Sequence, residues 1–389
     1  MLMTIGTTTD GHRQMVDMGV RLGSGHVVVQ APKYQEEQTL DHLVNDPAGV
    51  AAAAKTLPHV KHVAQRIAVT GLISSGETSA GVMIAGVEPD VEPLVSDIAS
   101  AKRRKRGGYL RTRAQMKFKN NPADVYLGEE LAKTLDVNLG DRVVLTASAK
   151  GGGKPASAAF YVRGTFQTNV SDIDSFMVQI PIDEARALLK LGKAATQVAL
   201  LLDNQDQTLA TAAALKARIG NDAIKVMPWQ EALKELYDAL VIDNGGGYVT
   251  MGIVFLIVCI GIFNTMLMSV MERTREFGVM MAIGTNQRRM FGIVVAEASV
   301  LGLVATLVGI GIGLGLHYWI ASVGIDVAAM AGGKYEFAGI AFDGRMYSTL
   351  MTSEVIYAAC GVFAMVVLSS IYPAWRATRL QPVEAMRHA

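Results

Sequence analysis

The chain has few of the residues on which disulfides and metal sites depend. Among 389 residues there are only 2 cysteines, Cys259 and Cys360, and both lie inside apolar runs. Cysteines in that setting act as small packing residues. His59 and His62 have metal-like spacing only in a helix and have no carboxylate nearby, so we interpret them as surface histidines. We therefore expect no metal site.

Catalytic and nucleotide-binding signatures are also missing. The stretch 151–155 reads GGGKP, and Ser148 stands where the first glycine of a phosphate-binding loop would be, so we interpret it as a hairpin loop. No serine, cysteine or threonine lies in a nucleophile elbow. The formal net charge of +1 gives no basic field for nucleic acid. We expect no catalytic residue, no cofactor site in this chain and no nucleic-acid partner.

Three long apolar runs are present instead: Tyr248–Met271, Met290–Ile325 and Val355–Trp375. A helix over the first run would be about 36 Å long, enough to cross a ~30 Å hydrocarbon layer. The composition, 50% hydrophobic with 18% charged residues, is too apolar for an ordinary soluble protein. We predict a membrane protein with three complete transmembrane helices. Glycines within the second run, among them Gly302 and Gly309, are expected to allow close helix packing.

The side of the membrane follows from the basic residues in short segments, because these stay in the cytoplasm. Such residues directly follow the first and third runs: Arg273, Arg275, Arg288, Arg289, Arg376, Arg379 and Arg387. Residues 25–243 then lie outside the cytoplasm, which requires an earlier crossing. No cleavable signal peptide is visible, and we expect MLMTI at the start to be the remnant of a first transmembrane helix.

Residues 25–243 alternate between short β-branched runs and amphipathic segments. Residues 61–75 and 198–203 are typical of strands, whereas 46–57 and 207–219 are typical of helices. This pattern predicts an α+β domain of two lobes. The basic run Lys102–Arg106 is interpreted as a solvated loop, with binding to anionic lipid headgroups or an acidic partner as the alternative.

The expected organisation is a series of eight segments. They are 1–24 (remnant of the first transmembrane helix and its external extension), 25–243 (α+β external domain), 244–271 (transmembrane helix), 272–289 (cytoplasmic coupling segment), 290–325 (transmembrane helix), 326–353 (short external loop), 354–376 (transmembrane helix) and 377–389 (cytoplasmic tail).

Two stretches resemble a known family. The run from Asn264 to Leu316 (NTMLMSVMERTREFGVMMAIGTNQRRM…) and the ending YPAWRATRLQPVEAMR at 372–387 resemble FtsX-like ABC transporter permeases. Four external segments are similar to the lipoprotein-releasing (LolC/LolE-like) branch: GVEPDVEP at 86–93, YLGEELAKTLDVNLGDRVVLTA at 126–147, VRGTFQTNVSDID at 162–174 and MPWQEALKEL at 227–236. The tail also resembles MacB-type permeases.

The resemblance implies a role for the charged segment after the first apolar run. It would be a coupling helix in a groove of a separate ABC ATPase, with Phe277, Met280 and Met281 as apolar anchors. The coupling residues implied are Glu272, Arg273, Arg275, Glu276, Phe277, Met280, Met281 and Gly284. The partner ATPase, not this chain, would bind ATP and Mg²⁺. Its closure would move the external domain without passing substrate through the bilayer, which the family calls mechanotransmission.

The resemblance also implies a dimer with a second permease copy or paralogue in the bacterial inner membrane, with the large domain in the periplasm. The cargo would be a lipoprotein or another hydrophobic molecule, passed to a periplasmic carrier. The cargo path would include Tyr248, Met251, Phe255 and Phe263. Two alternatives remain open: a MacB-type macrolide or peptide exporter with a periplasmic adaptor, and an FtsX-type regulator of cell-wall hydrolases.

Overall fold

The computed structural model describes residues 2–37, 39–116, 122–151, 155–221, 223–326, 335–337, 340–342 and 345–379. The chain divides into two compact units, which are described separately. Unit 1 comprises residues 1–13, 240–327 and 344–389, and unit 2 comprises residues 14–239 and 328–343. Helices α1 (Leu2–Gly19) and α10 (Lys234–Glu272) contribute residues to both units.

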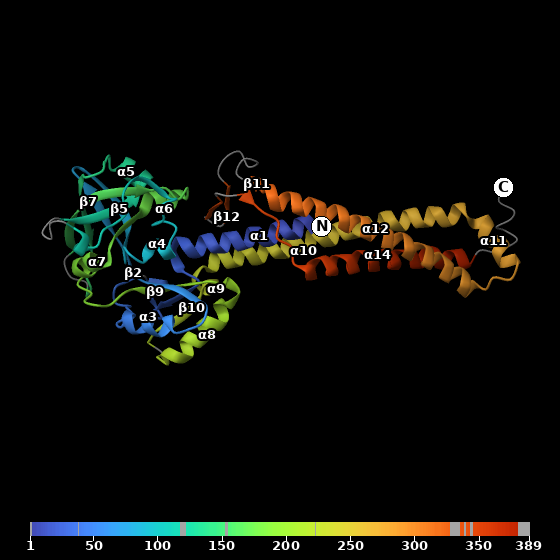
Figure 1. Cartoon of the computed structure of the whole chain (residues 1–389), viewed down its shortest axis with the longest axis horizontal. Coiled ribbons are helices and arrows are strands. Elements are labelled where there is room, and N and C mark those ends of the chain that lie inside the picture. Colours follow the sequence, from blue (N-terminus) through green and yellow to red (C-terminus); the bar gives the residue numbers. More distant parts are fainter. Residues whose placement is uncertain are drawn as a thin grey trace. The chain divides into compact units, whose positions relative to one another are not determined.

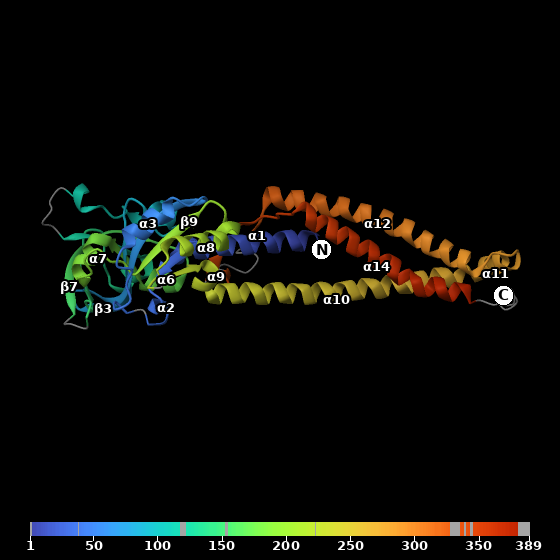
Figure 2. The ribbon, with the colours of Figure 1, turned by 90° about the horizontal axis from the view of Figure 1, so that it is seen from below.

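Unit 1 is built from long apolar helices. Helices α10, α12 (Gln287–Val323) and α14 (Thr352–Thr378) are each long and apolar enough to cross a membrane, as the three apolar runs predict. In unit 1 they extend along a common direction in both ribbon views (Figures 1 and 2). The short helix α11 (Thr274–Ala282) separates α10 from α12, and the two-residue strands β11 (Ile325–Asp326) and β14 (Arg345–Met346) pair beyond α12.

Helix α10 continues for 39 residues, across the predicted domain boundary at 243/244. Three glycines, Gly245 to Gly247, lie within it. Glycine lowers helix stability by about 1 kcal/mol per residue, but unlike proline it retains the backbone hydrogen bond. The external domain and the first membrane span are therefore joined by one uninterrupted helix.

Helices α12 and α14 approach closely at Gly302. A Cβ atom at this position would lie 2.8 Å from Cγ1 of Val366, so any larger residue would force the Val366 side chain or one of the helices to shift. The predicted close packing is confirmed here. At Gly309 no atom lies within 4 Å of such a Cβ, so among the described residues no helix packs on that glycine.

Unit 2 holds a ten-stranded sheet with the order β10-β1-β9-β2-β3-β8-β5-β7-β4, in which β6 pairs with β2 and β7. The pairs β3–β8 and β5–β7 are parallel and the others antiparallel. The strands are β1 (Val27–Gln30), β2 (Val60–Ser75), β3 (Thr78–Val87), β4 (Arg104–Gly107), β5 (Ala123–Gly128), β6 (Arg142–Ala147), β7 (Ala156–Phe166), β8 (Met177–Pro181), β9 (Gln197–Leu202) and β10 (Lys225–Pro228).

The helices of unit 2 are short, and two separate apolar cores form against the sheet. One core lies between α3 (Pro47–Lys55), α8 (Thr208–Ile219) and strands β1 and β9. The larger core lies around β2, β3, β5–β8 and helices α5 (Glu129–Thr134) and α7 (Ile182–Leu189). The remaining elements of unit 2 are α2 (Tyr34–Glu37), α4 (Glu92–Val95), α6 (Ser171–Phe176), α9 (Trp229–Ala232) and the strand pair β12 (Tyr335–Phe337) and β13 (Ile340–Phe342).

Strand β2 connects the two cores. Its first half pairs with β9, and its second half pairs with β3 and β6. Figure 1 shows α3 and α8 near β9 and β10, and α5 near β5 and β7. The predicted α+β domain with two lobes is confirmed in this form: two cores share one sheet through a 16-residue strand.

The basic run at 102–106 is only partly a loop. Residues Arg104–Gly107 form β4 and pair with β7, so the loop interpretation is wrong for residues 104–106. Strand β4 lies at one end of the sheet order, and its charged side chains are largely exposed. Charged residues on an edge strand hinder pairing with another chain, which explains a basic sequence in a strand. Gly152 and Gly153 of the expected hairpin tip lie outside the described residues.

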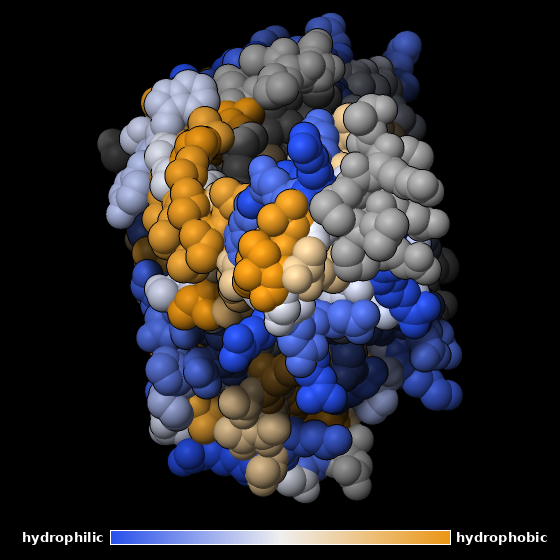
Figure 3. All heavy atoms as spheres, turned by 90° about the vertical axis from the view of Figure 1, so that its right-hand side faces the viewer, coloured by the Kyte–Doolittle hydropathy of each residue, from blue (hydrophilic) through white to orange (hydrophobic). Residues whose placement is uncertain are grey.

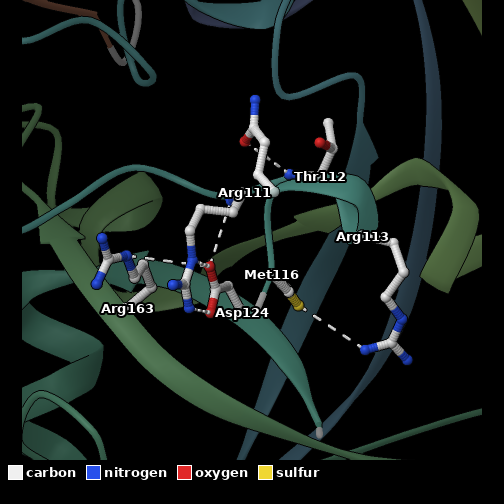
Figure 4. Close-up of polar contacts among 7 residues, drawn as sticks. Arg111, Thr112, Arg113, Met116, Asp124 and Arg163 are labelled. Atoms are coloured by element: carbon white, nitrogen blue, oxygen red, sulfur yellow. Dashed lines mark hydrogen bonds and ion pairs between the residues drawn. The ribbon is translucent and has the colours of Figure 1, made fainter. Parts of the chain in front are cut away.

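Hydrogen bonds between Asp124 of β5 and Arg111 hold the segment before β5 against the sheet. Asp124 is buried and accepts hydrogen bonds from Arg111 at Nε (2.8 Å) and Nη2 (2.9 Å), and from its backbone N–H (3.3 Å). Arg163 Nε lies 4.0 Å from the same carboxylate (Figure 4). The hydrogen bond to Asp124 raises the pKa of Arg111 above its ordinary value. The positive charges of two arginines thus compensate the negative charge of one buried carboxylate, and we assign this cluster a role in folding stability.

Candidate functional site at the α10–α11–α12 junction

Arg273 joins three elements where α10 ends. Its backbone leaves the helical conformation (φ −100°, ψ 13°) and begins α11. Its guanidinium donates from Nε to Glu276 Oε2 (2.9 Å) and from Nη1 to both oxygens of Glu297 on α12 (2.8 and 2.9 Å). The guanidinium carbon also lies 5.5 Å from the centroid of the Phe277 ring. One side chain therefore ties the start of α11 to α12.

A small apolar cluster lies next to this ion pair. Phe277 is only 2% exposed and packs with buried side chains of α10, α12 and α14: Val270, Met290, Val294, Ala374 and Ala377. Met280 and Met281 pack against the same cluster and are half-buried. Residues three and four apart share a helix face, so these three side chains form the inner face of α11. Movement of α11 is thereby coupled to the three long helices.

Gly284 ends α11 with two backbone hydrogen bonds. Its N–H donates to Met281 O (3.0 Å), and the N–H of Thr285 donates to Met280 O (3.0 Å). This pair of bonds is the Schellman motif, which needs a left-handed residue at the turn. Gly284 has φ +104°, a conformation that strains any other residue. Asn286 then caps α12 by accepting from the N–H of Arg288 (3.3 Å).

The outer face of α11 is exposed and mixed in character. Val279 and Ile283 are 42% and 82% exposed, and Arg275 and Glu276 are exposed beside them. The end of unit 1 that carries α11 faces the viewer in Figure 3, where hydrophobic and hydrophilic side chains lie next to one another. Apolar anchors within a charged rim are typical of protein–protein contacts. We call these four residues the α11 outer face.

The structure separates the expected coupling residues into two groups. Glu272, Arg275, Glu276 and Gly284 are exposed, and Arg273 is partly exposed. Phe277 was expected to be a surface anchor, but its ring fills the cluster inside unit 1, so that expectation is wrong for the described conformation. The exposed apolar residues are Val279 and Ile283, which the sequence reasoning missed. Their spacing of four residues, opposite to Phe277 and Met281, is the signal that identifies them.

The expected cargo-path residues lie along α10. Met251, Phe255 and Phe263 are half-buried, whereas Tyr248 is 76% exposed. The Phe263 ring lies 5.5 Å from the Tyr372 ring of α14, and Phe255 Cζ lies 4.0 Å from the position of a Cβ at Gly361, also in α14. Phe255 and Phe263 therefore line the α10 face that points toward α14. Tyr248 makes no such ring contact among the described residues.

Comparison with known proteins defines the class. Residues 248–382 match the model of the FtsX-like permease C-terminal domain, and residues 1–218 match the MacB-like periplasmic core domain. The second match covers more than half of the chain. The chain therefore belongs to the FtsX-like permeases with a MacB-like periplasmic core domain, and it is an ABC transporter permease.

Two of the individual relatives, LolC and LolE proteins, are similar over most of the chain, and a MacB protein is similar over a third of it. The lipoprotein-releasing system transmembrane protein LolC of Xylella fastidiosa (strain Temecula1) is 25% identical over 359 residues, covering 89% of this chain and 82% of LolC. LolE of Haemophilus influenzae is 23% identical and covers 93% of this chain and 84% of LolE. The macrolide export protein MacB of Syntrophobacter fumaroxidans is 32% identical over 130 residues, covering 33% of this chain and 15% of MacB.

Proposed function

We propose that this chain is the permease subunit of a lipoprotein-releasing ABC transporter in a bacterial inner membrane. Residues 25–243 lie in the periplasm, and α11 lies in the cytoplasm. The similarity to LolC and LolE over at least 89% of this chain supports the substrate class, since both relatives are named for lipoprotein release. The cargo is a lipoprotein or another hydrophobic molecule of the outer leaflet.

The observation that carries the proposal is the α11 outer face. It presents Val279 and Ile283 among charged side chains, while the inner face is fixed to α10, α12 and α14. A separate ATPase subunit, which binds ATP and Mg²⁺, holds this face in a groove. When two ATPase subunits close, they push α11 and the helices to which it is fixed. No step of ATP chemistry falls to this chain.

Helix α10 transmits this movement to the periplasmic domain. It runs without a break from Lys234 to Glu272, and a continuous helix moves as a rigid rod. The cargo enters beside the external half of α10, along Tyr248, Met251, Phe255 and Phe263. A second permease copy or a paralogue completes the transporter, and a periplasmic carrier receives the cargo.

The second candidate is export of a macrolide or peptide through a periplasmic adaptor. The 32% identity to MacB over 130 residues favours it, because it exceeds the identity to LolC, but it covers only 33% of this chain. Both candidates share the same coupling to an ATPase. They differ in the cargo and in the periplasmic partner.

The test is to purify the chain with its ATPase in lipid nanodiscs and to measure ATP hydrolysis with three kinds of cargo. We expect lipoprotein to co-purify with the complex and to change its turnover, whereas a macrolide and a peptide leave turnover unchanged. If only the macrolide or the peptide alters turnover, the exporter is the correct assignment. If lipoprotein neither co-purifies nor alters turnover, the proposal is refuted.

A further inference from the structure

Unit 2 contains a partly open cavity of about 490 Å³. Strands β1, β2, β3 and β8 form its walls together with residues 22–24, which follow α1 in the chain. Most of the lining side chains are apolar: Val28, Ile67, Met83, Ile98, Met177 and Leu233. The volume lies within the ~300–1,000 Å³ range of small-molecule sites. The cavity is therefore large enough to hold one hydrophobic ligand.

The charges at the cavity wall compensate each other. Arg66 and Glu92 are both buried and form a two-point ion pair, with Nε–Oε2 at 2.9 Å and Nη2–Oε1 at 2.8 Å. Arg66 also donates from Nη1 to the backbone carbonyl of Gly23. Burial raises the pKa of Tyr34, so its hydroxyl is neutral, and it donates to Ala68 O at 2.5 Å. A charged ligand would bring an uncompensated charge into this wall, which is unfavourable.

Gln30 places a buried hydrogen-bond acceptor in this wall. In β1, alternation places Val27 and Val29 in the apolar core and turns Val28 and Gln30 to the cavity. Gln30 is only 8% exposed, and its Nε2 donates to Gln197 Oε1 at 2.9 Å. Its Oε1 has no hydrogen-bond partner among the residues that the structure describes. Because an unpaired buried acceptor is unfavourable, a ligand that donates an N–H or O–H to this oxygen would be stabilised.

We propose that the cavity binds one uncharged acyl chain joined to its carrier through a secondary amide. The apolar walls hold the chain, and the amide N–H donates to Gln30 Oε1. The inference deepens the proposed function and rests on it in one respect: the source of the chain is an N-acylated cargo. A free membrane lipid with two ester-linked chains has no donor next to its chains, so the hydrogen bond selects against it.

The experiment uses the full chain in lipid nanodiscs without ATPase or nucleotide. The probe is N-methyl dodecanamide with a diazirine at the chain end, and mass spectrometry identifies the labelled peptides. We expect label in β3 near Met83 and in β8 near Met177. Unlabelled N-methyl dodecanamide should compete about tenfold better than N,N-dimethyl dodecanamide, which has the same chain but no N–H.

Variants at two glutamines separate ligand binding from a structural role. Gln30→Leu removes the acceptor, and the two competitors should then become equally effective. Gln35→Leu is the matched control, because Gln35 lines the same cavity but its Nε2 already donates to Glu231 O and Ala232 O at 3.3 Å. It should keep the tenfold preference. Ala85→Phe fills the cavity and should abolish labelling of β3 and β8.

The outcomes are decisive in both directions. Equal competition by the two amides in the unmodified chain overturns the proposal, whatever the variants do. Label confined to α10, α12 and α14 overturns it as well, as does stronger competition by a macrolide than by either amide. Because no ATPase is present, these results do not depend on coupling through α11, and a failure of the proposed function at the ATPase would leave amide binding intact.

Discussion

Ile283 is the residue at which the proposed ATPase contact can be measured most clearly. Ile283 is 82% exposed, so truncating its side chain removes little packing within unit 1. Ile283→Ala removes about three methylene equivalents, each worth ~0.8 kcal/mol when buried, which amounts to about 2 kcal/mol at a closed interface. The affinity of the permease for its ATPase should therefore fall about 30-fold.

The assay is titration of the purified ATPase onto the permease in nanodiscs, followed by ATP turnover at saturation. Leu209→Ala is the control, because Leu209 is 61% exposed on α8 in unit 2 and should leave the affinity unchanged. Thermal melting should show both variants folded. An Ile283→Ala affinity within twofold of the unmodified chain would refute the α11 outer face as the docking surface.

Three further predictions concern the parts that hold the site and the periplasmic domain in place. Gly284→Ala forces an alanine into a left-handed backbone conformation, which costs ~1–2 kcal/mol, so hydrogen exchange of the amides over 280–285 should become faster. Gly292→Ala is the control and should leave this exchange unchanged, because Gly292 lies at an open position of α12 and has no positive φ. Glu297→Gln weakens the ion pair with Arg273. Because the two side chains are 44% and 39% exposed, the loss of folding stability is about 0.5 kcal/mol, and the melting temperature should fall by only ~1 °C. The stimulation of ATP turnover by cargo should decrease, and an unchanged stimulation would contradict a positioning role for this pair. His26 is buried and accepts the N–H of Leu202 at Nδ1 (3.1 Å), and burial lowers its pKa below 6.5. As the pH falls below 6.5, His26 is protonated in the unfolded state before it is protonated in the folded state, so the stability of unit 2 should decrease. His26→Gln should flatten this dependence of stability on pH. An identical dependence in the variant would show that another group is responsible.

The membrane part was the most predictable from the sequence. A run of more than twenty uncharged residues has few stable alternatives to a helix, so the three spans were clear, and the resemblance of 264–316 identified the family. Short apolar and β-branched runs bounded by turn residues likewise identified β2, β3 and β9, although β9 is buried on both faces. The boundary predicted at 243/244 lies inside α10, because the helix continues through Gly245 to Gly247 without a break.

Contacts between distant segments were not predictable in this way. Nothing local in Arg104–Gly107 distinguishes an edge strand from a basic loop, since pairing with β7 decides it. The same holds for Phe277, which looks like an anchor in a charged segment until α12 and α14 cover it. The cavity depends on Gln30, Arg66 and Glu92, which come from separate elements and meet only in the folded unit.

The central claim is that α11 contacts an ATPase through its outer face while its inner face stays within the permease. The most direct measurement places a photo-cross-linking amino acid at position 283, and in a separate variant at position 277, in the nanodisc complex. We expect a permease–ATPase product from position 283, and from position 277 only a product within the permease. A product with the ATPase from position 277 alone, or no ATPase product from position 283, would contradict it.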